Sequence, residues 1–420
     1  MATTTLDQQV ERNFRWNFSV NLLDVSFIIL GISMVSRETV VPLLISKLTD
    51  SPLAIGLVPA VYSLGIYLPQ LLGAGVAERL TYKKPFVMVA GVGERLPYLL
   101  AGLAVALLAG RWPFGALVAV IAMQGLSGAA AGFATPAWYD MIAKVIPLRR
   151  RGLFTGLSHG LGALMGVAGA GVIGLVLERW DYPQGFVLLF LLSFAMMVVS
   201  WGGLALNREP ASPSVREPAP LASYLRRLPG ILRGDRNYAR YLAAIAVVRA
   251  GAMAVGFLLV YGAARFGLSG AEVGLLTGVL IGAQALLNPL WGLLGDRRGH
   301  KLVLVGGALA LALATGLAWL APSWPWLVAA FVLLGGFLAA DSTSSLNIIL
   351  EFCDEADRPT YIGLTNTLLA PAIALAPLLG GWLAGWAGYP PMLMLATLLA
   401  AVGAGLLAGW VREPRRHRLP

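Results

Sequence analysis

The chain has 420 residues, of which 58% are hydrophobic and only 12% are charged. A soluble protein of this length needs a more highly charged surface, so the composition excludes an ordinary soluble globular fold. The formal net charge of +10 is compatible with nucleic-acid binding, but the basic residues follow the membrane topology described below, and no nucleic-acid partner is expected.

Long apolar runs recur along the whole chain. A helix needs about 20 mostly apolar residues to cross the hydrocarbon core, and these runs are too long and too poor in polar alternation for barrel strands. Backbone groups in lipid must be paired within their own segment, which favours helices. The sequence therefore predicts an all-α membrane protein with twelve transmembrane helices. The predicted spans are residues 18–46, 53–76, 85–109, 113–139, 152–177, 184–206, 240–265, 271–293, 301–320, 325–349, 360–386 and 390–411.

Residues 1–17 are polar and lack the apolar core and small-residue cleavage site of a secretory signal peptide, so no cleaved signal is expected. The 31 Lys and Arg residues are distributed unevenly. With the start placed in the cytoplasm, four of them fall outside and three within the membrane, which leaves 24 in cytoplasmic segments. This bias predicts a multi-pass protein of the cell (inner) membrane of a prokaryote, with both termini in the cytoplasm.

Residues 207–239 form the one long polar interruption between the predicted helices. The segment contains five prolines and six arginines. Part of it, 221–228, is compatible with a short amphipathic helix on the membrane surface or with a flexible tether. The interruption divides the chain into an N-terminal bundle at 1–206 and a C-terminal bundle at 240–420, each with six predicted helices.

A charged segment, 292–301, lies between the eighth and ninth predicted helices, and a weaker copy, 74–83, lies between the second and third. In both copies an acid is followed directly by Arg, and Lys stands five positions after the acid. Further matches occur in the same order, such as Gln70 with Asn288. Together they support a duplication of six helices. The expected fold is two pseudo-symmetric six-helix bundles.

The segment 292–301 resembles the loop motif Gly-x-Leu-Ala-Asp-Arg-x-Gly-Arg-Lys of the major facilitator superfamily, and 147–152 resembles that family's Pro-x-x-x-Arg-Gly pattern. In the copy at 74–83, Ala74 replaces the leading Gly of the motif, Glu78 replaces the Asp and Thr81 replaces the second Gly. The resemblance extends over essentially the whole chain. It implies a monomeric secondary transporter that moves a small-molecule substrate by alternating access, with no enzyme activity and no cofactor.

The resemblance also implies that the charged loops form latches, which hold the cytoplasmic face closed and open as the halves move. Asp296 is then expected to engage Arg151 or the start of the fifth helix, and Glu78 the start of the eleventh. Alternatively, these basic loops only enforce membrane orientation. The residues assigned to the cytoplasmic gating loops are Glu78, Arg79, Lys83, Asp140, Arg151, Gly292, Asp296, Arg297, Gly299 and Lys301.

Ionisable residues inside the predicted helices cost about 2.5–3.5 kcal/mol each to insert, so each needs a partner or a function. Asp24, Gly31 and Glu38 recur at intervals of seven on the first predicted helix, which suits a proton path or a cation site. Alternatively, Asp24 is a hydrated residue near the cytoplasmic mouth. Glu94 and Arg95 are adjacent and do not face each other cleanly, so at least one of them is expected to form a structural ion pair with another helix. The proton-coupling candidates are Asp24, Glu38 and Asp341.

Arg249 and Asp341 fall in the same half of the second bundle. They are expected either to pair with each other or to bind an anion and a cation separately. Uncharged polar residues in membrane helices more often hold helices together than bind substrate. The substrate-cavity candidates are Arg37, Gln124, Arg249, Gln284, Asn288 and Asn366.

One cysteine, Cys353, predicts no disulfide within the chain, and the three histidines are scattered, so no metal site is expected. The chain has no Gly-x-x-x-x-Gly-Lys-Ser/Thr phosphate loop, which argues against ATP as the energy source.

Three functions are compatible with the sequence. The first is proton-coupled export of a small organic compound. The Gly-Pro-x-x-Gly-Gly pattern of exporters is not present in the fifth helix, so export is weakly favoured over uptake and has no sequence signature to support it. The second is uptake or exchange of an anionic solute, an organic acid or organophosphate, through Arg37 and Arg249, although their depths differ by about 15 Å. The third, a remote alternative, is an intramembrane serine hydrolase with Ser127 as nucleophile and His159 as base; its geometry fails, because His159 lies well away from Ser127 in depth.

Overall fold

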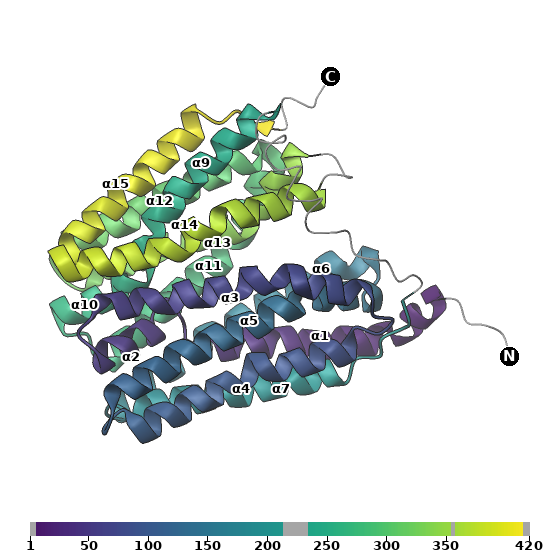
Figure 1. Cartoon of the computed structure of the whole chain (residues 1–420), viewed down its shortest axis with the longest axis horizontal. Helices are drawn as coiled ribbons and strands as arrows, with labels where there is room; N and C mark the ends of the chain where they lie inside the picture. The colour runs from purple at the N-terminus through teal and green to yellow at the C-terminus, as the bar shows by residue number, and fades with distance from the viewer. Residues whose placement is uncertain (1–5, 213–233, 354–357, 415–420) are drawn as a thin grey trace. The chain divides into compact units, whose positions relative to one another are not determined.

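Helices make up almost all of the structure, a computed structural model that describes residues 6–212, 234–353 and 358–414 (Figure 1). The predicted amphipathic helix at 221–228 lies outside the described residues. The N-terminal helices are α1 (Leu6–Met34), α2 (Val40–Leu48), α3 (Pro52–Glu78), α4 (Lys84–Leu108), α5 (Pro113–Val145), α6 (Leu148–Arg179) and α7 (Gln184–Ala205). The C-terminal elements are α9 (Arg236–Gly251), the 3₁₀ helix η1 (Ala252–Phe257), α10 (Leu258–Phe266), α11 (Gly270–Arg298), α12 (His300–Leu320), α13 (Pro325–Phe352), α14 (Arg358–Ala387) and α15 (Tyr389–Gly409).

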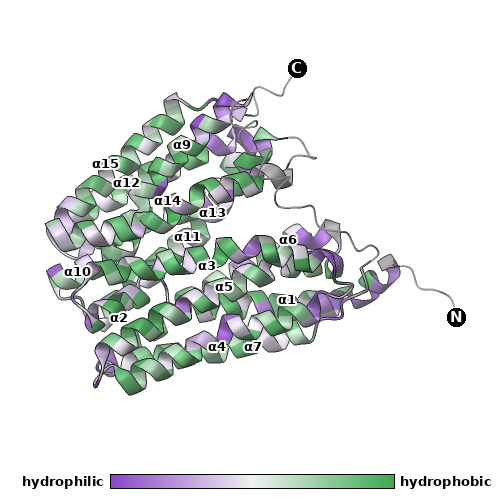
Figure 2. Cartoon of the chain, in the orientation of Figure 1, coloured by the Kyte–Doolittle hydropathy of each residue, from purple (hydrophilic) through white to green (hydrophobic). Residues whose placement is uncertain are grey.

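The prediction of twelve membrane spans is confirmed within the described residues, where 12 helical segments are long and apolar enough to cross a bilayer. Figure 2 shows hydrophobic residues along the lengths of the helices and hydrophilic residues concentrated near helix ends. Ten of the predicted runs each match one helix with only small shifts at their ends. The runs at 18–46 and 240–265 are the exceptions.

The prediction of one continuous helix over 18–46 is wrong, because α1 ends at Met34 and α2 begins at Val40. Pro42 explains the interruption. It has no N–H to donate to the Glu38 carbonyl, and its ring would clash with that carbonyl in a continuous helix. In the first turn of a new helix the missing donor costs nothing, and Thr39 takes the position before α2.

The run at 240–265 is also divided, since η1 separates α9 from α10. The tighter turn follows Gly251, where an added Cβ would lie 2.7 Å from the backbone nitrogen of Ala400 on α15. A 3₁₀ segment inside a long helix marks a place where regular packing is interrupted. The interruption lies directly after Arg249, the residue in the last turn of α9.

The chain divides into two compact units. Unit 1 comprises residues 1–36 and 61–218, and unit 2 comprises 37–60 and 219–420. In unit 1, α4 packs against α5 and α7, and α1 packs against α6 and α7. In unit 2, α13 packs against α11 and α12, and α15 packs against α9 and α12.

The segment 37–60 belongs to unit 2 although the first six predicted helices surround it in the sequence. The hydroxyl of Thr277 on α11 donates to that of Thr39 at 3.0 Å, and both residues are fully buried. An added Cβ at Gly56 would overlap the carbonyl of Pro377, and one at Gly381 would lie 2.6 Å from the carbonyl of Pro52. Small residues therefore allow the start of α3 to approach α14 backbone to backbone.

Glycines also bring α3 and α5 together in unit 1. An added Cβ at Gly132 would overlap the carbonyl of Ile66 and lie 2.8 Å from that of Gly65. By contrast, Gly171 on α6 has no heavy atom within 4 Å of a Cβ position. The two sites therefore separate the effect of close helix packing from the general effect of replacing glycine in a helix.

We expect Gly132→Ala to destabilise the purified protein by about 1–3 kcal/mol, because the methyl group forces the two backbones apart. Gly171→Ala is the matched control and should be neutral or slightly stabilising, since alanine is the better helix former. Thermal unfolding in detergent measures both. Equal melting temperatures for the two variants would contradict the close packing of α3 on α5.

Candidate functional site

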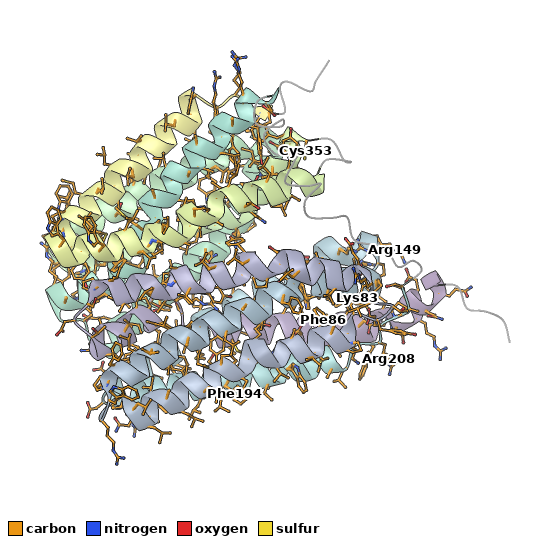
Figure 3. All side chains as sticks on the ribbon, viewed as in Figure 1. Lys83, Phe86, Arg149, Phe194, Arg208 and Cys353 are labelled. Atoms are coloured by element: carbon orange, nitrogen blue, oxygen red, sulfur yellow. The ribbon has the colours of Figure 1, made fainter. Side chains whose placement is uncertain are left out.

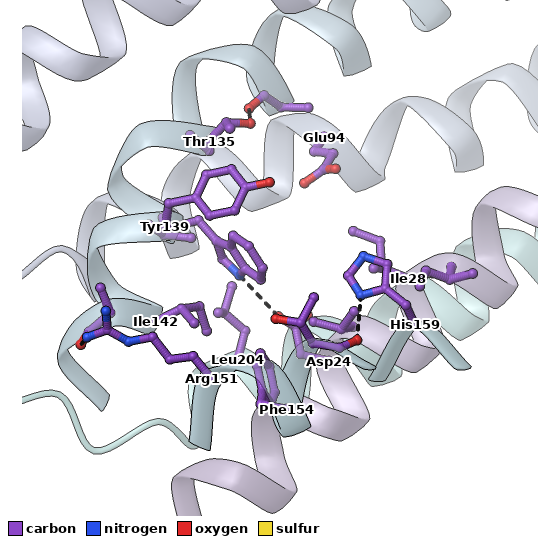
Figure 4. A pocket seen from close by; sticks show the side chains of 18 of the residues that line it. Asp24, Ile28, Glu94, Thr135, Tyr139, Ile142, Arg151, Phe154, His159 and Leu204 are labelled. Carbon is purple, nitrogen blue, oxygen red and sulfur yellow. Dashed lines mark hydrogen bonds between the residues drawn. The ribbon is translucent and has the colours of Figure 1, made fainter. Parts of the chain in front are cut away.

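A cavity of about 640 Å³ lies inside unit 1, between α1, α4, α5, α6 and α7 (Figure 4). Its walls are mostly apolar, and charged side chains are present at a few positions. The lining residues are Asp24, Val25, Ile28, Ile29, Val87, Glu94, Arg95, Ala131, Ala134, Thr135, Trp138, Tyr139, Ile142, Ala143, Arg151, Phe154, Thr155, His159 and Leu204.

Helical periodicity explains how the sequence forms these walls. On α5 the lining positions recur at intervals of three or four residues, which places them on one face of the helix. Ala131 and Ala134 leave the space open, whereas the large side chains of Trp138 and Tyr139 line it about one turn after Ala134. Figure 4 shows the hydroxyl end of Tyr139 pointing toward the Glu94 side chain.

Asp24 is the buried carboxylate of this cavity, with 3% of its surface exposed. The Ser200 hydroxyl donates to its Oδ1 at 2.6 Å, and the indole nitrogen of Trp138 lies 3.4 Å from its Oδ2 (Figure 4). The Arg95 Nη2 lies 3.5 Å from Oδ1. The interpretation of Asp24 as a hydrated residue at the mouth is therefore wrong, since α4, α5 and α7 all supply groups that enclose it.

Arg95 is equally buried, with 5% of its surface exposed, and every nitrogen of its guanidinium has a partner. Its Nε donates to the Met197 carbonyl at 3.1 Å, and its Nη2 donates to Ser200 at 3.0 Å. Its Nη1 lies 3.1 Å from Oε2 of Glu94. The expected pairing to another helix is present, since Arg95 reaches Asp24 on α1 and Ser200 on α7, and Arg95 also pairs with its neighbour Glu94.

Two carboxylates and one guanidinium thus meet at this part of the wall, with a local net charge of −1 when both acids are ionised. A further cation, Arg151, lines the cavity elsewhere, and its guanidinium donates to the carbonyls of Ile146, at 3.1 Å, and Ala143. These are the last carbonyls of α5, where the helix dipole favours a cation. Arg151 therefore caps α5 and leaves the charge around Arg95 uncompensated.

Unit 2 contains a second intramembrane ion pair. Arg249 Nη1 lies 2.9 Å from Asp341 Oδ2, and Nη2 lies 2.5 Å from Oδ1. Ser345, one turn along α13, donates to Asp341 Oδ1 at 2.6 Å. Of the two arrangements expected from the sequence, the structure has the one in which Arg249 and Asp341 pair. Their contact is bidentate, which is the strongest geometry for a guanidinium and a carboxylate.

Arg37 and Glu38 lie in the turn between α1 and α2 and belong to unit 2. The predicted stripe of Asp24, Gly31 and Glu38 on one helix face is therefore wrong, because the helix ends before Glu38. Gly31 remains on α1, where the Ser193 hydroxyl donates to its carbonyl at 2.6 Å.

The uncharged candidates have different environments. Asn288 on α11 accepts hydrogen bonds from Ser342 at 3.0 Å and Thr343 at 3.2 Å on α13, which is the helix-joining role expected of such residues. Gln124 is buried on α5 but does not line the cavity of unit 1. Gln284 and Asn366 are half-buried on α11 and α14.

In the first gating loop, Lys83 is buried and its ammonium lies 3.3 Å from Asp140 on α5. Both Glu209 oxygens accept backbone N–H groups, from Lys83 and Lys84 at 2.8 Å each. Glu209 also pairs with Lys144, and only 2% of its side chain is exposed. This acid, absent from our predicted site, caps the start of α4. Glu78 and Arg79 are exposed.

The second gating loop turns at Gly299, whose φ of 95° favours glycine. An added Cβ there would also lie 2.5 Å from the Glu413 carboxylate. Lys301 donates to the Ala408 carbonyl at 2.8 Å. Asp296 and Arg297 are exposed, and Gly292 is half-buried at the preceding turn of α11. The proposed latches of Asp296 and Glu78 stay predictions.

The hydroxyl of Ser127 donates to the backbone carbonyl of Glu94 at 2.8 Å, and 1% of the residue is exposed. His159 lines the cavity from α6, and its Nδ1 lies 3.0 Å from the Thr155 carbonyl. Ser127 thus joins α5 to α4, so the Gly-x-Ser-Gly likeness reflects helix packing.

Sequence reasoning missed Ser200, Trp138 and Glu209. Ser200 and Trp138 carry no pattern of their own, since serine is common in membrane helices and the indole faces Asp24 only after α1 and α5 have packed. The position of Trp138 gives no signal either, because it lies one residue before the end of the predicted run 113–139, where tryptophans are common.

A model of the Major Facilitator Superfamily matches residues 26–262 and 241–420. A multi-drug resistance efflux pump PmrA homolog of Lactococcus lactis is 29% identical over 152 residues, which is 35% of this chain and 37% of that protein. A probable vesicular acetylcholine transporter-B of Danio rerio is 35% identical over 147 residues, or 34% of this chain and 30% of that protein. The alignments thus span about a third of each relative.

Two solved structures have a similar fold over nearly the whole chain. Nucleoside transporter NupG superposes with a TM-score of 0.73 at 12% identity, covering 94% of this chain and 100% of that one. A D-xylose–proton symporter superposes with a TM-score of 0.68 at 14% identity, covering 95% and 98%. At this identity the likeness concerns the fold alone.

We expect Arg95→Met to destabilise the protein by about 3–5 kcal/mol, because Asp24 would keep a buried charge without its cation. The double variant Asp24→Asn/Arg95→Met should recover part of this loss, since it removes the buried charge of Asp24 and leaves only the more exposed Glu94 without its cation. Thermal unfolding of the two variants and of Asp24→Asn completes the cycle. Independent, additive effects of the two substitutions would contradict the coupling.

Proposed function

The chain belongs to the Major Facilitator Superfamily, and we propose that it exports a small, hydrophobic organic cation in exchange for protons, with Asp24 as the shared binding group. As a member of this family it is an integral multi-pass membrane protein and a secondary transporter, not an enzyme. The hypothesis of a serine hydrolase at Ser127 is therefore wrong.

The observation that carries the proposal is a buried carboxylate on the wall of a mostly apolar cavity. Asp24 is 3% exposed, and its neighbours Val25, Ile28 and Ile29 line the same space. An apolar wall binds the hydrocarbon part of a solute through burial of its surface, and the local charge of −1 favours a positive group beside it. A proton and an organic cation then compete for one site.

The geometry supports such an exchange. Arg95 and Ser200 hold Asp24 in place, with Arg95 Nη2 at 3.5 Å and the Ser200 hydroxyl at 2.6 Å from Oδ1. Protonation of Asp24 would remove its attraction for a cation and favour release. Glu94 would continue to pair with Arg95 at 3.1 Å, so the guanidinium keeps an anionic partner in both states.

The names of distant relatives support export as the direction of transport. Several of the similar proteins are multidrug efflux pumps, among them PmrA of Streptococcus pneumoniae, 23% identical over 154 residues. Because these alignments cover 38% of that protein, export and a multidrug substrate range are proposals for this chain.

We further propose that the protein acts as a monomer in the cell membrane of a prokaryote, with both termini in the cytoplasm. The parts that move are proposed to be 1–206 and 240–420, joined by 207–239. Figure 3 supports the orientation, since Lys83, Arg149 and Arg208 lie at the same end of unit 1 as the start of α1, in line with a positive-inside bias.

We expect Asp24→Asn to reduce pH-gradient-driven transport of a fluorescent aromatic cation at least about ten-fold, because the amide neither binds protons nor attracts cations. The assay is uptake into inverted proteoliposomes that hold the purified protein. Asp181→Asn, an exposed acid in the α6–α7 loop, is the charge-matched control. Full activity of Asp24→Asn would refute the assigned role.

The same assay tests the anionic alternative. In this structure Arg249 is engaged by Asp341, so it is not poised for an anionic solute. We expect Arg249→Gln to leave the cation specificity unchanged. If Arg249→Gln abolished transport of an organic acid or organophosphate while Asp24→Asn kept it, the function would be anion uptake or exchange.

A further inference from the structure

A groove of about 470 Å³ lies between the first turns of α1 and the start of α6 in unit 1. It is lined by Phe14, Arg15, Phe18 and Ser19 on α1 and by Arg150 and Leu153 on α6. None of these residues lines the cavity that contains Asp24. Figure 3 shows Arg149, the neighbour of Arg150, at the same end of unit 1 as Lys83 and Arg208.

The groove combines two exposed guanidiniums without a carboxylate to balance them. In the described part of the chain no acid lies within ion-pairing distance of Arg15 or Arg150. The neighbouring Arg149 differs, because its Nη2 lies 2.7 Å from Glu11. Two arginines on facing helices with an unfilled space between them suit an anion with several oxygen acceptors, such as a phosphate diester.

Apart from Ser19, the remainder of the groove is apolar. Phe14 and Phe18 stack edge to face with ring centroids 5.5 Å apart, and Phe18 meets Phe154 in the same way at 5.7 Å. Leu153 is exposed beside Arg150, and three more exposed leucines continue one stripe of α6 away from the groove. They are Leu157, Leu161 and Leu164.

The groove lies at the level expected for the boundary between hydrocarbon and headgroups. Arg15 precedes Asp24 by nine residues on α1, a rise of about 14 Å. The adjacent Trp16 is exposed, and its indole nitrogen donates to the Leu206 carbonyl at 2.9 Å. An exposed tryptophan near a helix end is typical of the membrane–water interface. A ligand there would have its charged part near water and its apolar part in the membrane.

We propose that this groove is a binding site for one anionic glycerophospholipid, with the phosphate between Arg15 and Arg150 and an acyl chain along the leucine stripe of α6. The aromatic floor, the paired charges and the continuing apolar stripe match the three parts of such a molecule. The bound lipid would hold α1 against α6 at the end where the solute cavity is also built, and it makes no use of Asp24.

The test is native mass spectrometry of the full chain in detergent, with phosphatidylglycerol, phosphatidylcholine and glycerol 3-phosphate titrated separately. We expect preferential binding of one phosphatidylglycerol, weaker binding of phosphatidylcholine, and no binding of glycerol 3-phosphate at equal concentration. Arg15→Gln/Arg150→Gln should weaken the phosphatidylglycerol complex about 25-fold, from about five-fold for each basic residue near an anionic surface.

Two control variants separate a site from general surface charge. Arg12→Gln/Arg79→Gln removes the same charge from exposed positions outside the groove and should retain the lipid, and Arg15→Lys/Arg150→Lys should retain most of the affinity. Unchanged melting temperatures without lipid confirm folding. Equal loss in the Arg12/Arg79 variant, equal binding of glycerol 3-phosphate, or undiminished binding by the Gln variant would each overturn the proposal.

Discussion

One buried guanidinium organises unit 1. Arg95 is inserted among apolar helices, where an unpaired charge is costly. Its partners come from three helices: Asp24 on α1, Glu94 on α4 itself, and Ser200 with the Met197 carbonyl on α7. Trp138 adds α5 through its contact with Asp24. Four helices are thus held in register by the need to satisfy one charge, and the cavity of unit 1 is the space left beside that contact.

The same requirement governs the ends of the helices. Lys83, which the family resemblance links to movement between the halves, is bonded inside unit 1 to Asp140. Glu209 caps α4 from the segment that follows α7 and pairs with Lys144 on α5. The loop between α3 and α4 is therefore tied to two neighbouring elements, α5 and the segment after α7, which suits a bundle that moves as a rigid body.

Helix positions could be predicted because hydrophobic length and the demand for internal backbone pairing act locally. The two divided runs show the limit. Pro42 carries a visible signal for the break between α1 and α2, but a proline inside α4 at Pro97 and one inside α5 at Pro136 leave those helices continuous. Whether a proline ends a helix depends on how the neighbouring helices pack against it, and this cannot be read from one sequence.

The sequence by itself determined the twelve spans, the all-helical class, the duplicated charged loops and the identity of the intramembrane charges, because each depends on residue type and spacing along the chain. Only the tertiary structure decided which charges meet. Arg95 with Asp24, Arg249 with Asp341 and Lys83 with Asp140 join helices distant in sequence. Such pairings depend on the rotation and depth of each helix, which are set by side-chain packing between helices rather than by local pattern.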